Sequence, residues 1–211
     1  MNNYHYIIAG LPLLSPGGED KGFNYTKLRD EIYSQCSKKD KALIDLLEKG
    51  FVEENLSKEF YNSALGSRSH FVRDYYALDL AIRNKKVESV SKRLFAPETA
   101  SQKVAAYSLD LESHLEQEDE RKLDSIFKNG NIVEKEKELD DFKWGKINEF
   151  TLFDLFCIDN ILAFLAKGKL VDRWNILDKE KGKSLFKKLV DEVRSTYDKT
   201  KLSYTTDENN G

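Results

Sequence analysis

One stretch of this sequence limits the fold more than any other. From about Ser57 to Leu94 the chain has no proline, and its apolar side chains return at intervals of four, three and four residues. This spacing places them on one side of an α-helix, so the stretch predicts one long helix. A second apolar row follows with a shifted phase, which is typical of a helix that packs against neighbours on more than one side. The first row is Phe71, Tyr75, Leu78 and Ile82, and the second is Val87, Val90 and Leu94.

The composition also favours an all-α fold. The 211 residues include only 11 glycines and 3 prolines, which is little material for a turn-dense β-sandwich or barrel. With 12 Phe, 10 Tyr and 2 Trp, the chain has too much apolar surface for global disorder. We therefore predict a multi-helix bundle in a single domain over residues 1–198, with a candidate sub-boundary near 95–110, and a disordered tail over 199–211.

Local signals place the remaining elements. Ser37 is a good N-cap and Gly50 a good stop, so together they bracket a helix. Pro97 ends the long helix, and the Asn-Gly-Asn sequence at 129–131 predicts a turn between two further helices. The apolar stretch from Tyr4 to Leu14 predicts a short extended or irregular segment against the core. The other predicted helices cover residues 25–35, 38–49, 98–107, 112–128 and 132–148.

The C-terminal third contains the most apolar segment. Residues 151–167 are apolar almost all the way round, so a helix there must be covered on most sides. Leu170 to Leu177 is predicted as a connection, after which Asp178 caps a final helix to about Asp198. The inward face of that helix is predicted to carry Leu185, Phe186, Leu189, Val190, Val193 and Tyr197.

Charge and cysteine content restrict the compartment and the partners. The net charge of -3 is a poor basis for nucleic-acid binding, which relies on neutralising phosphates. The two cysteines are far apart in sequence and suit a reducing cytoplasm. Acidic side chains interrupt the apolar run at 150–166, which is also short for a membrane span. We expect no signal peptide, and membrane association only through a partner.

Charge is unevenly distributed along the chain. Residues 110–141 hold 12 acidic residues and 5 Lys or Arg. Two interpretations stay open: a solvated helical hairpin, or a face that docks a partner electrostatically. Lys183, Lys187 and Lys188 are predicted to form a solvated basic face.

The sequence contains no recognisable motif of catalytic, cofactor-binding or metal-binding residues. His5, His70 and His114 have no metal-ligand spacing. Gly17 and Gly22 have the spacing of a phosphate loop, but the lysine and hydroxyl that should follow are missing. We therefore expect neither an enzyme nor a cofactor.

Two polar pairs are candidates for a structural or interface role. Asp79 and Arg83 are four residues apart on one helix face, and form either a local ion pair or a pair that organises packing between helices or subunits. Arg173 and Trp174 are neighbours, and an arginine can stack on an aromatic face, so we interpret them as structural.

Three segments resemble an uncharacterised bacterial family related to the C-type subunit of V-type ATPases, the counterpart of the eukaryotic d-type subunit. They are the opening Tyr4–Pro12, the sequence FVRDYYALDLAIRN at 71–84, and the block Phe150–Arg194. The wider family carries a D-L-R-N-type core on the corresponding helix. Here Asp79, Leu80, Arg83 and Asn84 give a shifted version of that motif, and the chain is shorter than those relatives after Asn55.

The resemblance implies a fold like that of the C/d-type subunit of V-type ATPases, and the role of a non-catalytic subunit of a rotary, ion-translocating ATPase. Such a component couples the central stalk to the membrane rotor ring of proteolipid subunits, which would be its partners on the cytoplasmic, inner face of the cell membrane. The alternative is a helical protein–protein interaction module with another partner. The structural or interface candidates are Asp79, Arg83, Asn84, Arg173, Trp174 and Asp178.

Overall fold

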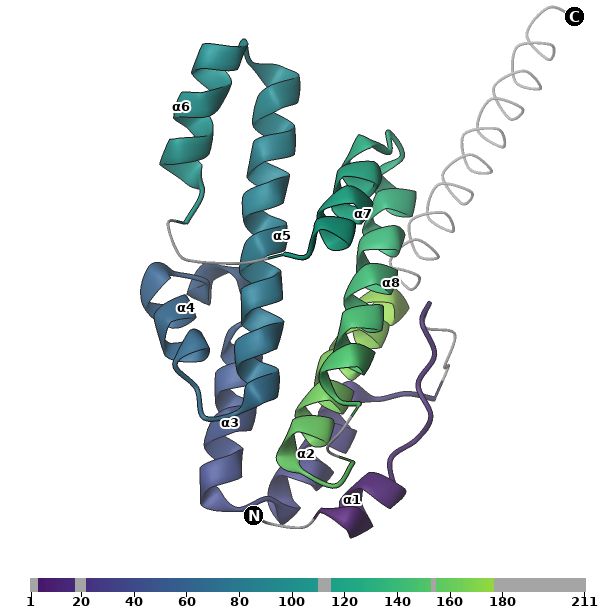
Figure 1. The fold of residues 1–211 in the computed structure, drawn as a ribbon. Coiled ribbons are helices and arrows are strands. Elements are labelled where there is room, and N and C mark those ends of the chain that lie inside the picture. The colour runs from purple at the N-terminus through teal and green to yellow at the C-terminus, as the bar shows by residue number, and fades with distance from the viewer. Residues whose placement is uncertain (1–3, 18–21, 110–114, 153–154, 177–211) are drawn as a thin grey trace, which may run out of the picture.

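The computed structural model describes residues 4–17, 22–109, 115–152 and 155–176. Within these ranges every regular element is helical and no strand occurs, which confirms the predicted all-α class. Figure 1 shows a bundle at the base and two helical hairpins that rise from it. The predicted helix over 178–198 and the predicted tail lie outside the described residues.

The base of the molecule is built from short N-terminal helices. They are α1 (His5–Ala9), α2 (Tyr25–Gln35), α3 (Lys38–Lys49) and the 3₁₀ turn η1 (Glu53–Asn55). The bounds of α2 and α3 match the prediction because both helices have local N-caps. The Asn24 side chain accepts a hydrogen bond from the Lys27 amide at 2.9 Å, and Ser37 Oγ accepts one from the Asp40 amide at 3.3 Å.

The N-terminal segment differs in part from the prediction. It lies against the core, as expected, because Tyr4 is buried and Ile7, Ile8 and Leu11 pack on the main cluster. However, α1 is a turn of helix, and only the residues from Leu11 onward lack regular structure. The prediction of an extended segment from Tyr4 is therefore wrong for its first half.

The long helix predicted over 57–94 is two helices, α4 (Lys58–Leu65) and α5 (His70–Leu94). The helix stops at Gly66 and restarts after Ser69, whose Oγ accepts from the Val72 amide at 3.1 Å. The Asp159 carboxylate stabilises this restart, since it accepts from Ser69 Oγ at 2.5 Å and from the Phe71 amide at 3.4 Å. The start of α5 is therefore stabilised by a residue far along the chain, and the helix is not continuous between Leu65 and His70.

The distal half of α5 forms a hairpin with α6 (Pro97–Tyr107), which runs back along it (Figure 1). Pro97 is at the first turn of α6, where its missing N–H costs nothing. Of the predicted second apolar row on α5, Val90 and Leu94 are exposed. This end of the hairpin therefore carries apolar side chains that no described helix covers.

A second hairpin consists of α7 (Gln117–Lys128) and α8 (Ile132–Phe150). The predicted turn at Asn129–Asn131 joins them, and the Asn131 side chain caps α8 by accepting from the Val133 amide at 3.0 Å. Both helices contact α5 and share with it a small apolar cluster. Its buried members are Leu78, Ile82, Leu123, Ile126, Phe127 and Leu139.

The last described helix covers residues 158–176. The predicted start at Thr151 is wrong because Thr151 is the C-cap of α8, and its hydroxyl donates back to the Ile147 carbonyl at 3.0 Å. The predicted connection at 170–177 is also wrong, since residues 170–176 continue the helix. The apolar stretch is covered as expected, with Ile161, Leu162 and Leu165 almost fully buried.

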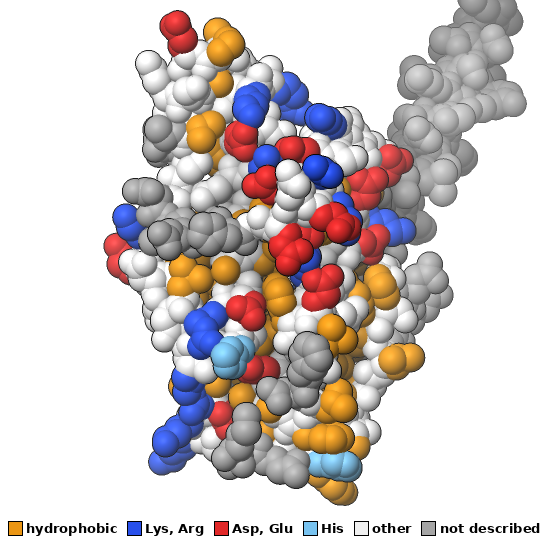
Figure 2. All heavy atoms as spheres, viewed as in Figure 1, with side chains coloured by type: hydrophobic (Ala, Val, Ile, Leu, Met, Phe, Trp, Pro, Cys, Tyr) orange, Lys and Arg blue, Asp and Glu red, His pale blue; other side chains and the backbone are white. Residues whose placement is uncertain are grey.

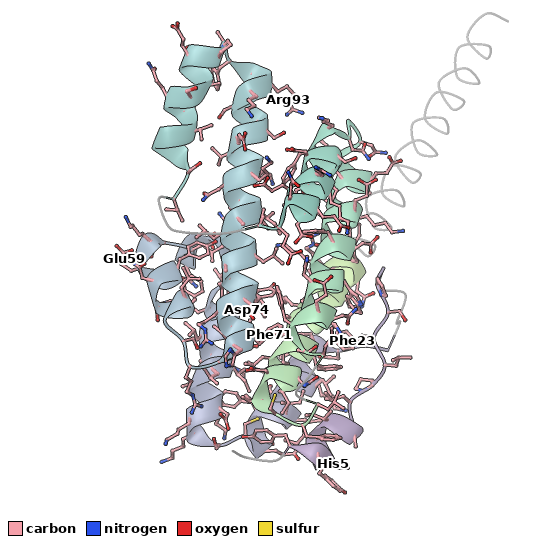
Figure 3. All side chains as sticks on the ribbon, viewed as in Figure 1. His5, Phe23, Glu59, Phe71, Asp74 and Arg93 are labelled. Carbon is pink, nitrogen blue, oxygen red and sulfur yellow. The ribbon has the colours of Figure 1, made fainter. Side chains whose placement is uncertain are left out.

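The main core lies where α2, α3, α4, α5 and the 158–176 helix meet. Phe71, near the base of α5 in Figure 3, stacks on Tyr75 and meets Phe150 edge-on. The chain also passes very close to aromatic rings at Gly50. A Cβ atom there would lie 2.2 Å from the Tyr76 hydroxyl, so this position leaves room only for glycine.

Candidate functional site: two buried carboxylates that join the helices

Asp79 is the polar centre of the upper core. Its Oδ2 accepts a hydrogen bond from the Tyr61 hydroxyl of α4 at 2.7 Å, and its Oδ1 lies 3.1 Å from Lys143 Nζ of α8. The predicted ion pair with Arg83 is present as well, with 3.4 Å between Arg83 Nε and Asp79 Oδ2. Asp79 and Arg83 therefore form a local ion pair on α5. Asp79 also organises packing between helices, because its contacts link α4, α5 and α8.

Electrostatics fix the charge states of this centre. Burial opposes ionisation of Asp79, but the Lys143 ammonium and the Tyr61 hydroxyl outweigh it, so the pKa of Asp79 lies below its usual value. Burial likewise opposes the ammonium of Lys143, but Asp79 raises the pKa of Lys143 above its usual value. Both groups are largely hidden, with side chains 16% and 19% exposed, so the pair is an internal salt bridge.

Asp140 forms a second centre one helical turn before Lys143. Its Oδ2 accepts from Trp174 Nε1 at 2.8 Å and from the Arg173 guanidinium. Arg173 also reaches Glu136, with 3.3 Å between Arg173 Nη1 and Glu136 Oε2. Burial raises the pKa of Asp140, opposed by the Arg173 charge and the Trp174 N–H. These contacts tie α8 to the 158–176 helix.

Asn84 holds the chain that leaves α6. Its side-chain amide donates to the Leu109 carbonyl at 3.1 Å, and its side-chain oxygen accepts from the Leu109 amide at 3.0 Å. Asn84 thus uses both amide functions on the backbone of one residue, in the way a neighbouring strand would. This contact holds Leu109 against α5.

The structure brings most of the predicted residues to these centres. Asp79, Arg83 and Asn84 lie along one part of α5, and Arg173 with Trp174 meets α8, with the Arg173 guanidinium 5.6 Å from the Trp174 ring centre. Both residues of this pair contact Asp140, and they lie in a helix and not in the predicted connection. Asp178 lies outside the described residues.

Sequence reasoning missed two of the main residues, Asp140 and Lys143. A signal for Lys143 was present, because it stands midway between Leu139 and Ile147 at spacings of four. A lysine within a buried helical stripe needs a buried partner of opposite charge. Asp140, next to Leu139, had no comparable signal, since a single acid beside an apolar residue is common on exposed helices.

A pocket of only about 10 Å³ borders Asp140 and Trp174, and larger cavities lie away from both centres. One of about 400 Å³ at the base is lined by residues that include Ser37, Asp40, Arg68 and His70. Both acids in its lining are already engaged. Asp40 accepts from the Ser37 hydroxyl at 2.7 Å and pairs with Arg68 at 2.7 Å, and Asp159 accepts from Ser69 Oγ at 2.5 Å. Within the described ranges, His, Cys, Asp and Glu side chains form no group of three or more suited to a metal ion.

The α5–α6 hairpin carries a cavity of about 650 Å³. Its lining is mostly apolar, with Phe95, Pro97, Ala100 and Val104, and also includes Glu88, Lys92 and Ser101. Leu94 and Phe95 at the tip are 62% and 41% exposed. Hydrophobic side chains are visible at this tip in Figure 2, so the hairpin offers an apolar surface for contact.

None of the helices in the described part of the chain combines the length and apolar character needed to cross a membrane. Comparison with family models gives one match, to a family described as "Protein of unknown function (DUF2764)", over residues 1–57 and 48–197. Neither the curated proteins nor the solved structures contain a significant match. The matched ranges include both carboxylate centres and both hairpins.

Proposed function

We propose that this chain, which belongs to the DUF2764 family, is a non-catalytic subunit of a V-type rotary, ion-translocating ATPase. It would resemble the C/d-type subunit, and it would couple the central stalk to the proteolipid ring. In that role it would sit on the inner face of the cell membrane, held there by its partner subunits. It would use no cofactor and carry out no hydrolysis itself.

The observation that carries this proposal is the internal bracing of the helices. A coupling element must transmit force without yielding, so its helices must not slide past one another. The Asp79 centre joins α4, α5 and α8, and the Asp140 centre joins α8 to the 158–176 helix. Both use charge-assisted hydrogen bonds in a partly dry interior, which are directional and resist sliding.

The α5–α6 hairpin supplies a surface for one of the contacts with other subunits. It projects from the bundle (Figure 1), and its tip exposes Leu94 and Phe95. Apolar tips of this kind are typical of the desolvated centre of a protein–protein interface. We propose that another component of the ATPase covers this tip in the assembled complex.

The direct test is affinity purification of the full chain from its native host, followed by mass spectrometry. We expect subunits of the central stalk and of the proteolipid ring to co-purify. The double variant Leu94→Glu/Phe95→Glu should lose them, while Leu13→Glu/Val52→Glu should retain them. Leu13 and Val52 are also exposed, at 90% and 48%, and the charge change is the same.

Purification without any V-type ATPase component would overturn the proposal. If another protein co-purified in a manner sensitive to Leu94→Glu/Phe95→Glu, the alternative would hold, namely a helical interaction module with a different partner. The same apolar tip supports that alternative, because its chemistry does not depend on the identity of the protein that covers it.

A further inference from the structure

A groove of about 490 Å³ runs between α7 and α8. Its α8 wall contains Glu138, Asp141, Gly145 and Glu149, whose spacing of three or four residues follows one face of that helix. At a rise of about 1.5 Å per residue, this face is roughly 16 Å long. The groove therefore has the length of about three helical turns, which suits a helical segment better than a small ligand.

The floor of the groove is apolar. It contains Ile126 of α7, which is buried, and Phe142 of α8, which packs on the small apolar cluster shared with α5. Gly145 stands beside them, and a Cβ atom added there would meet no other atom within 4 Å. The groove therefore has room at this point for an apolar side chain from outside.

The two walls of the groove are joined by Lys146. Its Nζ lies 2.7 Å from Asp119 on α7 and 2.7 Å from Glu149 on α8, and its side chain is only 13% exposed. The small apolar cluster joins the same two helices from below. The groove is thus formed before an occupant arrives, so its own side chains lose little conformational freedom on binding.

The rim of the groove is acidic. Four of the side chains that line it are carboxylates and two are lysines. Both lysines are already paired, Lys146 as above and Lys122 with Glu118 at 2.8 Å. Glu138 and Asp141 are exposed, and neither forms an ion pair with another residue of the described ranges. Figure 2 shows acidic side chains gathered over α7 and α8.

This charge selects the kind of occupant. An acidic rim repels the phosphates of a nucleic acid and the acids of a like-charged protein, and it attracts lysine and arginine. A second copy that met the groove with its own α7–α8 face would bring the same acids together, which is unfavourable. An apolar floor with an acidic rim is instead complementary to an amphipathic helix whose apolar residues are flanked by basic ones.

We propose that the α7–α8 groove binds a helical segment of another protein that carries an apolar stripe flanked by lysine or arginine. One apolar side chain of this segment fills the space beside Gly145, over Ile126 and Phe142. Its basic side chains pair with Glu138 and Asp141. The inference concerns the chemistry of the partner and not its identity, so it is independent of the proposed ATPase role and of the α5–α6 tip.

Binding of a model peptide to the full chain tests the charge of the rim. The probe is a labelled peptide of about 14 residues, made only of leucine and lysine with its leucines on one helical face, followed by fluorescence anisotropy. The variant Glu138→Lys/Asp141→Lys should bind the probe at least about 10-fold more weakly than the wild type. The control Glu54→Lys/Glu98→Lys, with the same charge change at exposed acids of other elements, should bind it as the wild type does.

A second variant tests the shape of the groove. Gly145→Leu keeps every charge and fills the open space, so it should also weaken binding at least about 10-fold. Asn62→Leu, at an exposed position of α4, is its control and should bind normally. Wild-type affinity in either groove variant would overturn the proposal. Equal binding of a peptide of the same composition, with its leucines scattered around the helix, would overturn it as well.

Photo-crosslinking of the full chain in its native host identifies the occupant. The crosslinker p-benzoylphenylalanine is introduced at Ser125, an exposed residue of the groove, and at Asn62 as the control. We expect a link from position 125 alone, to a basic amphipathic segment of another protein, and its loss in Glu138→Lys/Asp141→Lys. This result does not depend on whether the linked protein is an ATPase subunit. A link to the same chain, to a second copy or to an acidic segment, or no link specific to position 125, would contradict the proposal.

Discussion

Lys143 Nζ lies 3.1 Å from Asp79 Oδ1, although the two residues are 64 positions apart in the sequence. The contact joins the middle of α5 to the middle of α8, at a level where both helices also meet the small apolar cluster with α7. Both side chains are largely removed from water, so each charge is stabilised mainly by the other. The upper half of the molecule is therefore sensitive to the loss of either partner.

A double-mutant cycle measures this dependence. Asp79→Asn and Lys143→Met should each cost about 3 kcal/mol of unfolding free energy, because each leaves the other charge buried without its partner. The double variant should cost clearly less than the sum of the two, since no unpaired charge remains. Urea unfolding at pH 7 measures all four proteins. Additive costs would show that the two groups do not interact. Glu53→Gln, which removes an exposed partner of Arg83, should cost less than about 0.5 kcal/mol.

The same pair predicts a dependence on pH. Because the pKa of Asp79 is lowered on folding, its contribution to stability is present above the unfolded value of about 3.9 and is lost as pH falls through the lower folded value. The stability gap between the wild type and Asp79→Asn should therefore be constant near neutral pH and shrink below about pH 4. Unfolding curves from pH 7 to pH 2.5 measure it. A gap that stays constant to pH 2.5 would contradict the assignment.

Trp174 should contribute through both its ring and its N–H. The ring is half-buried, and Nε1 donates to Asp140 at 2.8 Å. Trp174→Ala should cost about 2–3 kcal/mol, less than a fully buried tryptophan would. Trp174→Phe should cost about 1 kcal/mol, because it keeps most of the packing and removes the hydrogen bond. Thermal unfolding followed by circular dichroism distinguishes the two. Equal losses would show that the packing of the ring contributes little, and an unchanged stability of Trp174→Phe would show that the N–H is irrelevant.

Asn84 predicts a local effect. Asn84→Ala removes both hydrogen bonds to the Leu109 backbone, so the Leu109 amide should exchange at least 10-fold faster than in the wild type. The exchange of amides in α3 should not change. Asn62→Ala, at an exposed asparagine of α4, is the matched control and should leave Leu109 protected. Unchanged exchange at Leu109 in Asn84→Ala would show that this contact does not hold Leu109 in place.

Two glycines should respond in opposite ways to the same change. Gly50→Ala places a methyl group against the rings of Tyr76 and Phe60, both within 2.5 Å, and should destabilise the protein by about 1–3 kcal/mol. Gly145 has open space and lies inside α8, so Gly145→Ala should stabilise by up to about 1 kcal/mol through helix propensity. Chemical unfolding of both variants measures the effects. A neutral Gly50→Ala would show that the rings move away easily.

The helices that the sequence predicts correctly are those whose limits are encoded locally. The N-cap Ser37 and the stop at Gly50 give α3 its bounds, and Asn131 does the same for the start of α8. The first apolar row of α5 also predicts burial correctly, since Phe71 and Ile82 are almost fully buried. Such features depend on a few adjacent residues, so one sequence is enough to find them.

The features that the sequence does not predict depend on residues far apart in the chain. The break between α4 and α5 is stabilised from position 159, and the helical course of 170–176 is supported by Asp140. From the sequence, Lys143 resembles an ordinary solvated lysine, because its partner Asp79 is far away in the chain. Pairings of this kind require a known topology, and periodicity alone cannot supply it.

The link from Asp159 to the start of α5 also sets the order of events during biosynthesis. Ser69 leaves the ribosome 90 residues before the carboxylate that completes its helix start. At about 5–20 residues per second, that delay is roughly 5–18 s. During this time the base of α5 has only its serine cap. A nascent chain stalled before Asp159 should therefore remain open at this corner, within reach of chaperones and proteases, until translation supplies the missing acid.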